Sequence, residues 1–304
     1  MSLRSHCLSR PGPHRGLPAR CSASLAASCS RARQRQARVV EDGTVIAYDR
    51  AGQGPPLIVA VGAFCDRRTF VPPVDLTARF TVYNYDRRGR GDSGDTQPYS
   101  PEREVADLAA VIKAAAEPGS GSGSVSAGGG AFVFGHSSGA ALALRAAWEG
   151  VPIAAVAAHE APYFVRDTAA EDPAARITEL VGAGRRGDAV RYWMNDVVHA
   201  PAQVVKMMEG SPSWPGLEAM THTLPYDLEL SGDRGVPADN LATITVPVLV
   251  LGGANSPDWF RRTVEETSAA IPDARLVTLE GLDHGAPPAV LTPVLTEFFL
   301  GSAR

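Results

Sequence analysis

Short uninterrupted runs of apolar residues recur along the chain from about residue 39 onward, for example LIVAV at 57–61 and VPVLVL at 246–251. Strands that are covered by helices on both faces have this pattern, because neither face has to be polar. The runs therefore predict the strands of a mostly parallel sheet. We expect these strands at residues 44–50, 56–62, 80–86, 131–136, 153–160, 246–252 and 275–280.

Helical patterns separate most of these strands. We expect helices at residues 101–116, 138–149, 257–271 and 287–299. Regular alternation of strands and helices is typical of an α/β fold with a doubly wound, mostly parallel sheet. The Gly- and Ser-rich stretch at 118–130 reads as a surface loop inside this alternation.

Residues 161–240 interrupt the alternation, because they show helical patterns and no good strand. We interpret this segment as a helical cap inserted into an α/β core that consists of residues 39–160 and 241–304. The segment is rich in Trp and Met. We expect some of these side chains to line an apolar pocket and most of them to form the core of the cap.

The first 38 residues differ from the rest in composition. They hold eight Arg and no Asp or Glu, and they lack apolar periodicity, so residues 1–38 are expected to form a disordered basic extension. A targeting segment and a start codon placed too far upstream both fit this composition. The other residues carry 21 basic and 33 acidic side chains. An acidic body argues against nucleic acid as a partner, since phosphate binding needs a basic face.

Cysteine usage and hydropathy narrow the class of protein further. Only Cys65 lies outside the extension, which excludes a disulfide within the body and fits a reducing cytoplasm. No spacing of Cys and His suggests zinc, and no Gly-rich phosphate loop occurs, so we expect no metal and no cofactor. No apolar run reaches the roughly 18–20 residues of a membrane helix, so a soluble protein without a membrane partner is expected.

The sequence GHSSG at Gly135–Gly139 carries the strongest chemical signal. It follows the apolar run AFVF and opens the helical pattern SGAALALRAAWE. A serine at the centre of G-x-S-x-G on a turn from strand to helix is a nucleophile elbow, in which small neighbours allow a sharp turn that exposes the hydroxyl. The alternative is a Gly-rich turn that only caps the helix. We predict that Ser137 is a nucleophile.

A serine hydroxyl needs a base, and that base has to come from a distant part of the chain. The late sequence LEGLDHG supplies His284 after the last predicted strand and before the last predicted helix. A nucleophile followed later in the chain by its histidine is the order of this kind of fold. His284 is therefore the predicted general base, and a histidine on a surface turn is the alternative.

From residue 39 to 300 the chain resembles the α/β-hydrolase superfamily, and most closely the small capped esterase-like hydrolases of actinobacterial type. The motifs that carry the resemblance are YDRRGRGDSG at 85–94, GHSSG, HEAPYF at 159–164, VPVLVLGG at 246–253 and EGLDHG at 280–285. They are specific for the fold and weak on substrate, since this fold supports many chemistries.

The resemblance places an oxyanion hole after the strand LIVAV, where family members usually carry His-Gly. This chain has Val61 and Gly62 there. Backbone donors need no particular side chain, so the backbone N–H of Ala63 or Phe64, paired with that of Ser138, is still expected to serve. A plain turn at the end of the strand is the alternative.

The acid of the family usually follows VPVLVL in a G-x-x-D-P pattern, but here Ser256 stands in the place of the acid. Asp258 comes two residues later, where it reads as an acid at a helix start. Some haloalkane dehalogenases use an acid after the preceding strand, where this chain has Glu160. A carboxylate that closes an apolar strand needs a partner. Glu160 is the preferred candidate, with Asp258 or the absence of an acid as alternatives.

Together these residues predict acyl transfer to water. Ser137 attacks a carbonyl, His284 takes its proton, and Glu160 orients the imidazole. The expected substrate is a small, mainly apolar carboxylic ester or lactone. Two other readings stay open. One is a perhydrolase, a C–C hydrolase, or a tailoring thioesterase or cyclase on the same elbow. The other is a non-catalytic binding protein that keeps the fold.

Overall fold

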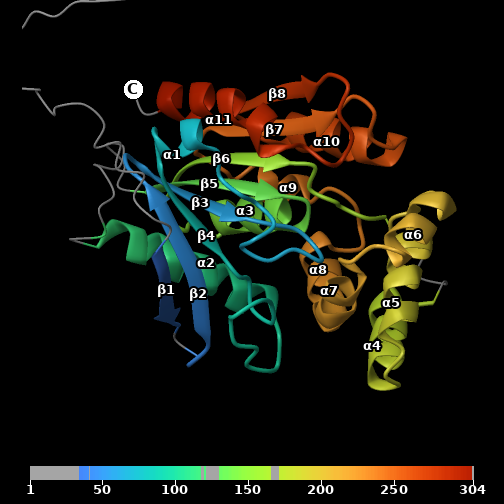
Figure 1. The fold of residues 1–304 in the computed structure, drawn as a ribbon. Helices are drawn as coiled ribbons and strands as arrows, with labels where there is room; N and C mark the ends of the chain where they lie inside the picture. Colours follow the sequence, from blue (N-terminus) through green and yellow to red (C-terminus); the bar gives the residue numbers. More distant parts are fainter. Residues whose placement is uncertain (1–33, 41, 118–119, 121–129, 166–170, 303–304) are drawn as a thin grey trace, which may run out of the picture. The chain divides into compact units, whose positions relative to one another are not determined.

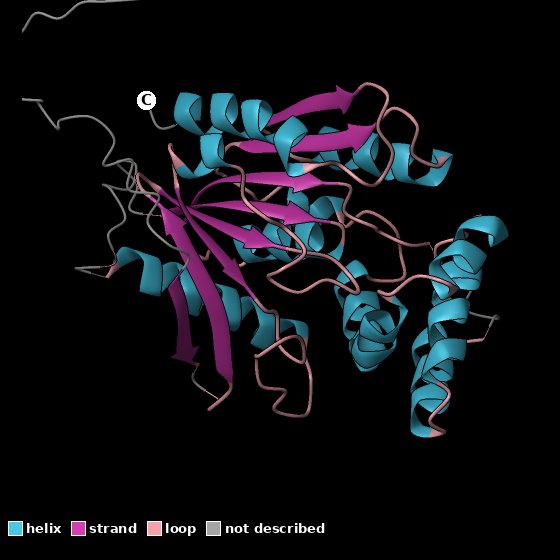
Figure 2. Cartoon of the chain, viewed as in Figure 1, coloured by secondary structure: helices cyan, strands magenta, loops and turns pink. Residues whose placement is uncertain are grey.

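A computed structural model describes residues 34–40, 42–117, 120, 130–165 and 171–302. The centre of the molecule is a twisted sheet with helices on both faces (Figures 1 and 2). Within the described residues the sheet has eight strands, in the order β1-β2-β4-β3-β5-β6-β7-β8. The strands are β1 Gln34–Val39, β2 Val45–Gly52, β3 Pro56–Ala60, β4 Thr81–Tyr85, β5 Ala131–His136, β6 Ile153–His159, β7 Val248–Gly253 and β8 Ala274–Leu279.

The seven predicted strands agree with β2 to β8 within two residues at each end. All neighbouring pairs from β3 to β8 are parallel, while β2 is antiparallel to both β1 and β4. Side chains of β3 alternate between the two apolar clusters, with Ile58 and Ala60 in one and Leu57 and Val59 in the other. This alternation explains why the strand is apolar throughout: both of its faces are buried.

The helices of the core are α1 Val74–Thr77, α2 Pro101–Ala116, α3 Ser138–Trp148, α10 Asp258–Ala270 and α11 Pro288–Ser302. Side chains of α2, α3 and α10 belong to the cluster on one face of the sheet, and side chains of α1 and α11 to the cluster on the other. The predicted α/β fold with a doubly wound sheet is confirmed.

The segment between β6 and β7 is helical where it is described. It contains α4 Pro173–Gly182, α5 Arg186–Tyr192, a π-helical turn at Trp193–Val197, α6 Ala202–Glu209, α7 Trp214–Met220, a 3₁₀ turn at Thr221–Thr223, α8 Leu224–Ser231 and α9 Ala238–Leu241. Helices α4 to α8 lie beyond the carboxyl ends of the parallel strands (Figure 1). Trp193 and Trp214 are buried in an apolar cluster of this segment, which also includes Phe64 from the core.

One boundary predicted from the sequence is wrong. Residues 34–38 were assigned to the disordered extension, but they belong to β1, which pairs with β2 along Gln34–Val39. The sequence QRQARV has no apolar run because β1 is an edge strand, where polar and charged side chains are favoured. The rest of the predicted extension, residues 1–33, lies outside the described residues, and so does most of the predicted loop at 118–130.

Candidate active site

Ser137 lies on a sharp turn between β5 and α3. Its backbone has φ 56° and ψ −128°, a conformation that L-residues rarely adopt. The turn needs glycine on both sides: a Cβ on Gly135 would come within 2.4 Å of the Gly139 carbonyl oxygen, and a Cβ on Gly139 within 2.2 Å of the Ala60 oxygen. The G-x-S-x-G spacing is therefore a packing requirement, and it leaves Ser137 partly exposed at the sheet's carboxyl edge.

Strained backbone gathers at the ends of three adjacent strands. Of the four non-glycine residues with positive φ in the described chain, Phe64 follows β3, Ser137 follows β5 and Glu160 follows β6. In the parallel register His136 pairs with His159, so the residues that follow them start from the same level of the sheet. Outliers of this kind cluster where the surrounding structure fixes a functional geometry.

Glu160 is fully buried at the end of β6 and accepts three hydrogen bonds. One carboxylate oxygen accepts from Nδ1 of His284 (2.6 Å). The other accepts from the Ser256 hydroxyl (2.6 Å) and from the Gly253 backbone N–H (2.7 Å). Burial alone would raise the pKa of Glu160, but these hydrogen bonds outweigh it and hold the pKa below its ordinary value. Glu160 is therefore a carboxylate at neutral pH.

The imidazole of His284 is held on several sides. The Phe260 ring stacks on it with centroids 4.5 Å apart. Nε2 of His136, the neighbour of Ser137, donates to the His284 backbone carbonyl (3.0 Å), which ties this loop to the elbow. Burial and two neighbouring imidazoles hold the pKa of His136 well below its ordinary value, so it is neutral. His284 and Ser137 do not hydrogen bond to each other in the structure, and such bonds are often long before substrate binds.

Asp258, the alternative acid, is placed differently. It starts α10 with its side chain 85% exposed, and it pairs with Arg261 one turn further along the same helix. Of the two candidate acids, the structure brings only Glu160 into contact with His284.

The backbone after β3 lies against the elbow. A Cβ on Gly62 would come within 2.6 Å of the Ser137 Cβ and 3.2 Å of its hydroxyl oxygen, so only glycine fits. Among the described residues, the backbone N–H groups of Ala63 and Ser138 donate to no other backbone group. The predicted oxyanion donors therefore lie on two segments that meet at Ser137.

Three contributors to this arrangement were not predicted. Ser256 was noted only as the residue that replaces the family's acid, yet it donates to Glu160. Phe260 and His136 contact the His284 ring from α10 and from the elbow. The GHSSG motif does point to His136 as a neighbour of the site, but nothing in the sequence indicates its bond to a loop 148 residues away.

The charged residues of the segment YDRRGRGDSG pair with partners outside the segment. Asp86 pairs with Arg67, while Arg88 binds Asp107. Arg87 reaches both Glu104 and the distant Asp227.

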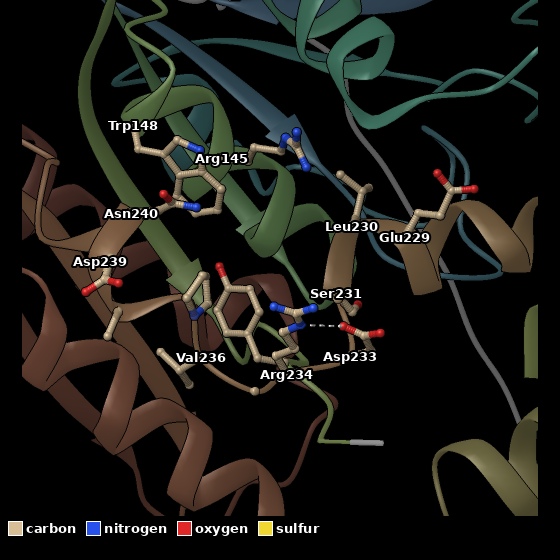
Figure 3. A pocket seen from close by; sticks show the side chains of 15 residues that line it. Arg145, Trp148, Glu229, Leu230, Ser231, Asp233, Arg234, Val236, Asp239 and Asn240 are labelled. Carbon is tan, nitrogen blue, oxygen red and sulfur yellow. Dashed lines mark ion pairs between the residues drawn. The ribbon is translucent and has the colours of Figure 1, made fainter. Parts of the chain in front are cut away.

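Two cavities lie near the helical segment, and neither is lined by Ser137 or His284. A cavity of about 560 Å³ opens between α3 and the segment from α8 to α9, with polar and charged side chains such as Arg145 and Asp239 (Figure 3). A second, of about 420 Å³, is lined by aromatic and apolar side chains that include Phe164, Val197 and Trp259. Trp259 stacks on Phe260, so this second cavity is two rings away from His284.

The described residues hold no group of three or more His, Cys, Asp or Glu that could bind a metal ion. No helix in the described part of the chain is both long and apolar enough to cross a membrane.

Comparison with known proteins agrees with the fold. The chain matches the Alpha/beta hydrolase family over residues 57–293. It is 47% identical to an alpha/beta hydrolase from Sphaerobacter thermophilus DSM 20745, whose crystal structure superposes with a TM-score of 0.78 over 87% of this chain and 100% of that one. The chain therefore belongs to the alpha/beta hydrolase family, and it is a hydrolase.

Less similar structures share the fold alone. The esterase RhEst1 from Rhodococcus sp. ECU1013 is 19% identical, with a TM-score of 0.60 over 88% of this chain and 98% of that one. The enol-lactonase from Burkholderia xenovorans LB400 is 20% identical, with a TM-score of 0.62 over 88% of this chain and 99% of that one. The comparison with curated proteins found no match.

Proposed function

We propose that this protein is a serine hydrolase that cleaves a small, mainly apolar carboxylic ester or lactone through an acyl-enzyme. The hydrogen bond of 2.6 Å between His284 Nδ1 and the buried Glu160 is the observation that carries the proposal. It fixes the imidazole with Nδ1 protonated, so that Nε2 is the free base. The strained elbow of Ser137 presents a hydroxyl at the same edge of the sheet.

The reaction follows from these positions. Nε2 of His284 takes the Ser137 proton as the hydroxyl oxygen attacks the substrate carbonyl, and Glu160 stabilises the imidazolium that forms. The N–H groups of Ala63 and Ser138 bind the oxyanion. His284 then gives its proton to the leaving alkoxide, which departs as the alcohol or, in a lactone, stays attached as a new hydroxyl. Water, deprotonated by His284, then attacks the acyl carbon, the bond to the Ser137 oxygen breaks to release the acid, and His284 returns the proton to Ser137.

The surroundings favour an apolar substrate. Phe64 follows the oxyanion segment and packs edge-on against Trp193, with ring centroids 6.2 Å apart. Phe260 and Trp259 continue the apolar surface on the side of His284. An esterase and an enol-lactonase share this fold, so both substrate types suit the scaffold.

A fluorophosphonate probe tests the proposal directly, because it labels a serine only when that serine is activated. We expect the wild type to be labelled at Ser137, with labelling lost in Ser137→Ala and kept in the control Ser302→Ala, which changes a serine on α11. Hydrolysis of p-nitrophenyl esters should fall about 10⁴-fold in Ser137→Ala. Wild-type protein that is folded and yet not labelled would favour a binding protein that keeps the fold.

A further inference from the structure

Two buried arginines hold the backbone that leads from β3 into the site. Nη1 of Arg87 donates to the Val61 carbonyl (3.2 Å), and Nη1 of Arg90 donates to the Gly62 carbonyl (2.6 Å). Both arginines are at most 1% exposed. Hydrogen bonds from charged donors are shorter and stronger than neutral ones, so the bond from Arg90 strongly restrains Gly62.

A single carboxylate joins these arginines to the nucleophile elbow. Asp227, on α8, accepts three hydrogen bonds at Oδ1: from the Ser138 hydroxyl (2.6 Å), from Arg90 (2.6 Å) and from Arg87 (3.0 Å). Burial alone would raise the pKa of Asp227, but the two arginines hold it below its ordinary value. Asp227 is thus a buried anion from the helical segment that binds the Ser138 hydroxyl directly and is linked to the Gly62 carbonyl through Arg90.

Peptide geometry turns this contact into a constraint on the active site. In a planar trans peptide, the carbonyl and the following N–H point in opposite directions. When Arg90 binds the Gly62 carbonyl, the Ala63 N–H is directed away from Arg90, and the Gly62 backbone faces Ser137. A charged donor on the carbonyl also polarises the peptide and strengthens its N–H as a donor.

We infer that Arg90 and Asp227 are positioning residues for the peptide between Gly62 and Ala63, which binds the oxyanion. The inference rests on the proposed function, because it assigns these residues to the transition state of that reaction. They act through the backbone and do not touch the substrate. The oxyanion hole is therefore ordered only when α8, which carries Asp227, packs against the core.

Arg90→Gln is the main test, because it removes the charged donor while keeping a polar side chain. Direct loss of one oxyanion donor typically costs about 10²–10³ in kcat. Arg90 acts through the peptide, so we expect kcat on p-nitrophenyl acetate to fall about 10–100-fold, with KM within about threefold. The inhibition constant of a trifluoromethyl ketone, which forms a tetrahedral adduct, should rise in step with the loss of kcat.

Asp107→Asn provides the matched control. Asp107 is a fully buried acid that binds Arg88 with two hydrogen bonds of 2.7 and 2.8 Å, and within the described residues neither side chain forms a hydrogen bond to the elbow or to the backbone after β3. A purely structural loss would affect both variants alike. We expect Asp107→Asn to lower the melting temperature and to leave kcat and ketone affinity within about twofold.

Two milder variants keep the inference testable if Arg90→Gln does not fold. Asp227→Asn keeps the shape of the side chain, and we expect kcat to fall about tenfold. Ser138→Ala keeps the backbone N–H and removes the hydroxyl, which donates to Asp227 (2.6 Å) and accepts from Arg87 (2.9 Å), with an expected loss of about threefold. A folded Arg90→Gln with kcat within twofold of wild type, or unchanged kcat in both milder variants, would overturn the inference.

Hydrogen exchange separates this inference from the proposed function. Amide exchange in the peptide spanning residues 57–66 should be faster in Arg90→Gln than in Asp107→Asn, whatever reaction the protein catalyses. If wild-type Ser137 is not labelled by fluorophosphonate, the proposed function fails, and faster exchange still supports the positioning role. Equal exchange in the two variants would contradict that role alone.

Discussion

Glu160 at the end of β6 and Asp258 at the start of α10 carry the same functional group in opposite environments. Glu160 is fully buried and accepts three hydrogen bonds, one of them from His284. Asp258 is 85% exposed and pairs with Arg261 on its own helix. A carboxylate can orient an imidazole and stabilise its charge only where water does not screen it and its position is fixed. The end of β6 meets both conditions, and the start of α10 meets neither.

The loop after β7 contributes to this difference even though it carries no acid. Its Ser256 stands where the family usually has the acid, and it donates to Glu160 from that place. The N–H of Gly253, the last residue of β7, donates to the same oxygen. In the proposed triad the acid therefore lies at the end of β6, one strand along the sheet from the usual place, and the loop after β7 supplies a hydrogen-bond donor instead.

Glu160→Gln is expected to show the largest effect within this comparison. Gln keeps the shape, but it can present an N–H to Nδ1 and so favour the wrong tautomer of His284, and it cannot stabilise the imidazolium. We expect kcat to fall about 10²–10⁴-fold. Steady-state kinetics with p-nitrophenyl acetate measure the change, and circular dichroism checks the fold. Wild-type kcat in a folded Glu160→Gln would leave Glu160 with a structural role only.

His159 tests how strongly the end of β6 is desolvated. Its side chain is fully buried, and neither ring nitrogen has a hydrogen-bond partner in the described chain. The rings of His136 and His284 lie beside its own ring. Burial is the main cause that lowers the pKa of His159 to about 4, against a smaller opposing effect of Glu160. As pH falls below about 6.5, the unfolded chain therefore binds a proton at this residue that the folded protein binds only near pH 4.

His159→Gln should remove this contribution, because Gln does not titrate. In the wild type, His159 contributes stability that is present above about pH 6.5 and lost by about pH 4, with a total of about 3 kcal/mol. Between pH 7 and pH 4.5 the free energy of unfolding should thus fall less in the variant than in the wild type. Urea titrations at both pH values measure it. An equal fall in the free energy of unfolding of the wild type and the variant would mean that water reaches the end of β6.

Ser256→Ala should have a smaller effect on catalysis. It removes one of the three donors to Glu160, and the carboxylate oxygen that it faces keeps only the Gly253 N–H. A hydrogen bond to a charged group contributes about 1.5–3 kcal/mol, of which only the part that orients His284 appears in kcat. We expect kcat to fall about 3–10-fold and the melting temperature to fall as well. Unchanged values of both would show that the Gly253 N–H alone fixes Glu160.

The parts of the fold and site that could be predicted are those with a local pattern. Short β-rich runs, several of them continuously apolar, indicate β2 to β8, and the glycines around Ser137 indicate the elbow, because such patterns reflect burial or steric need at the residues themselves. The polar edge strand β1 has no such pattern, since its main support is the backbone ladder to β2. Asp227 looks like any acid of an amphipathic helix, and its contact with Arg87, 140 residues away, depends on how α8 packs.

Asp258→Asn is expected to show the smallest effect, and it is the strictest check on the comparison. The side chain is largely solvated, and its pairing with Arg261 and its place at the helix start are each worth little at the surface. An acid in the first turn typically contributes about 0.3–1 kcal/mol to its helix, and none of this acts on the imidazole. We therefore expect kcat to change less than threefold and the melting temperature to fall slightly. The variant should be assayed beside Glu160→Gln, on the same ester and at the same pH.

If Asp258→Asn loses most of its activity and Glu160→Gln is near wild type, α10 must move in solution so that Asp258 reaches His284. Burial at the end of β6 would then serve the fold alone. If neither substitution matters, the enzyme works as a pair of Ser137 and His284, and the bond of 2.6 Å to Glu160 serves to anchor the histidine loop.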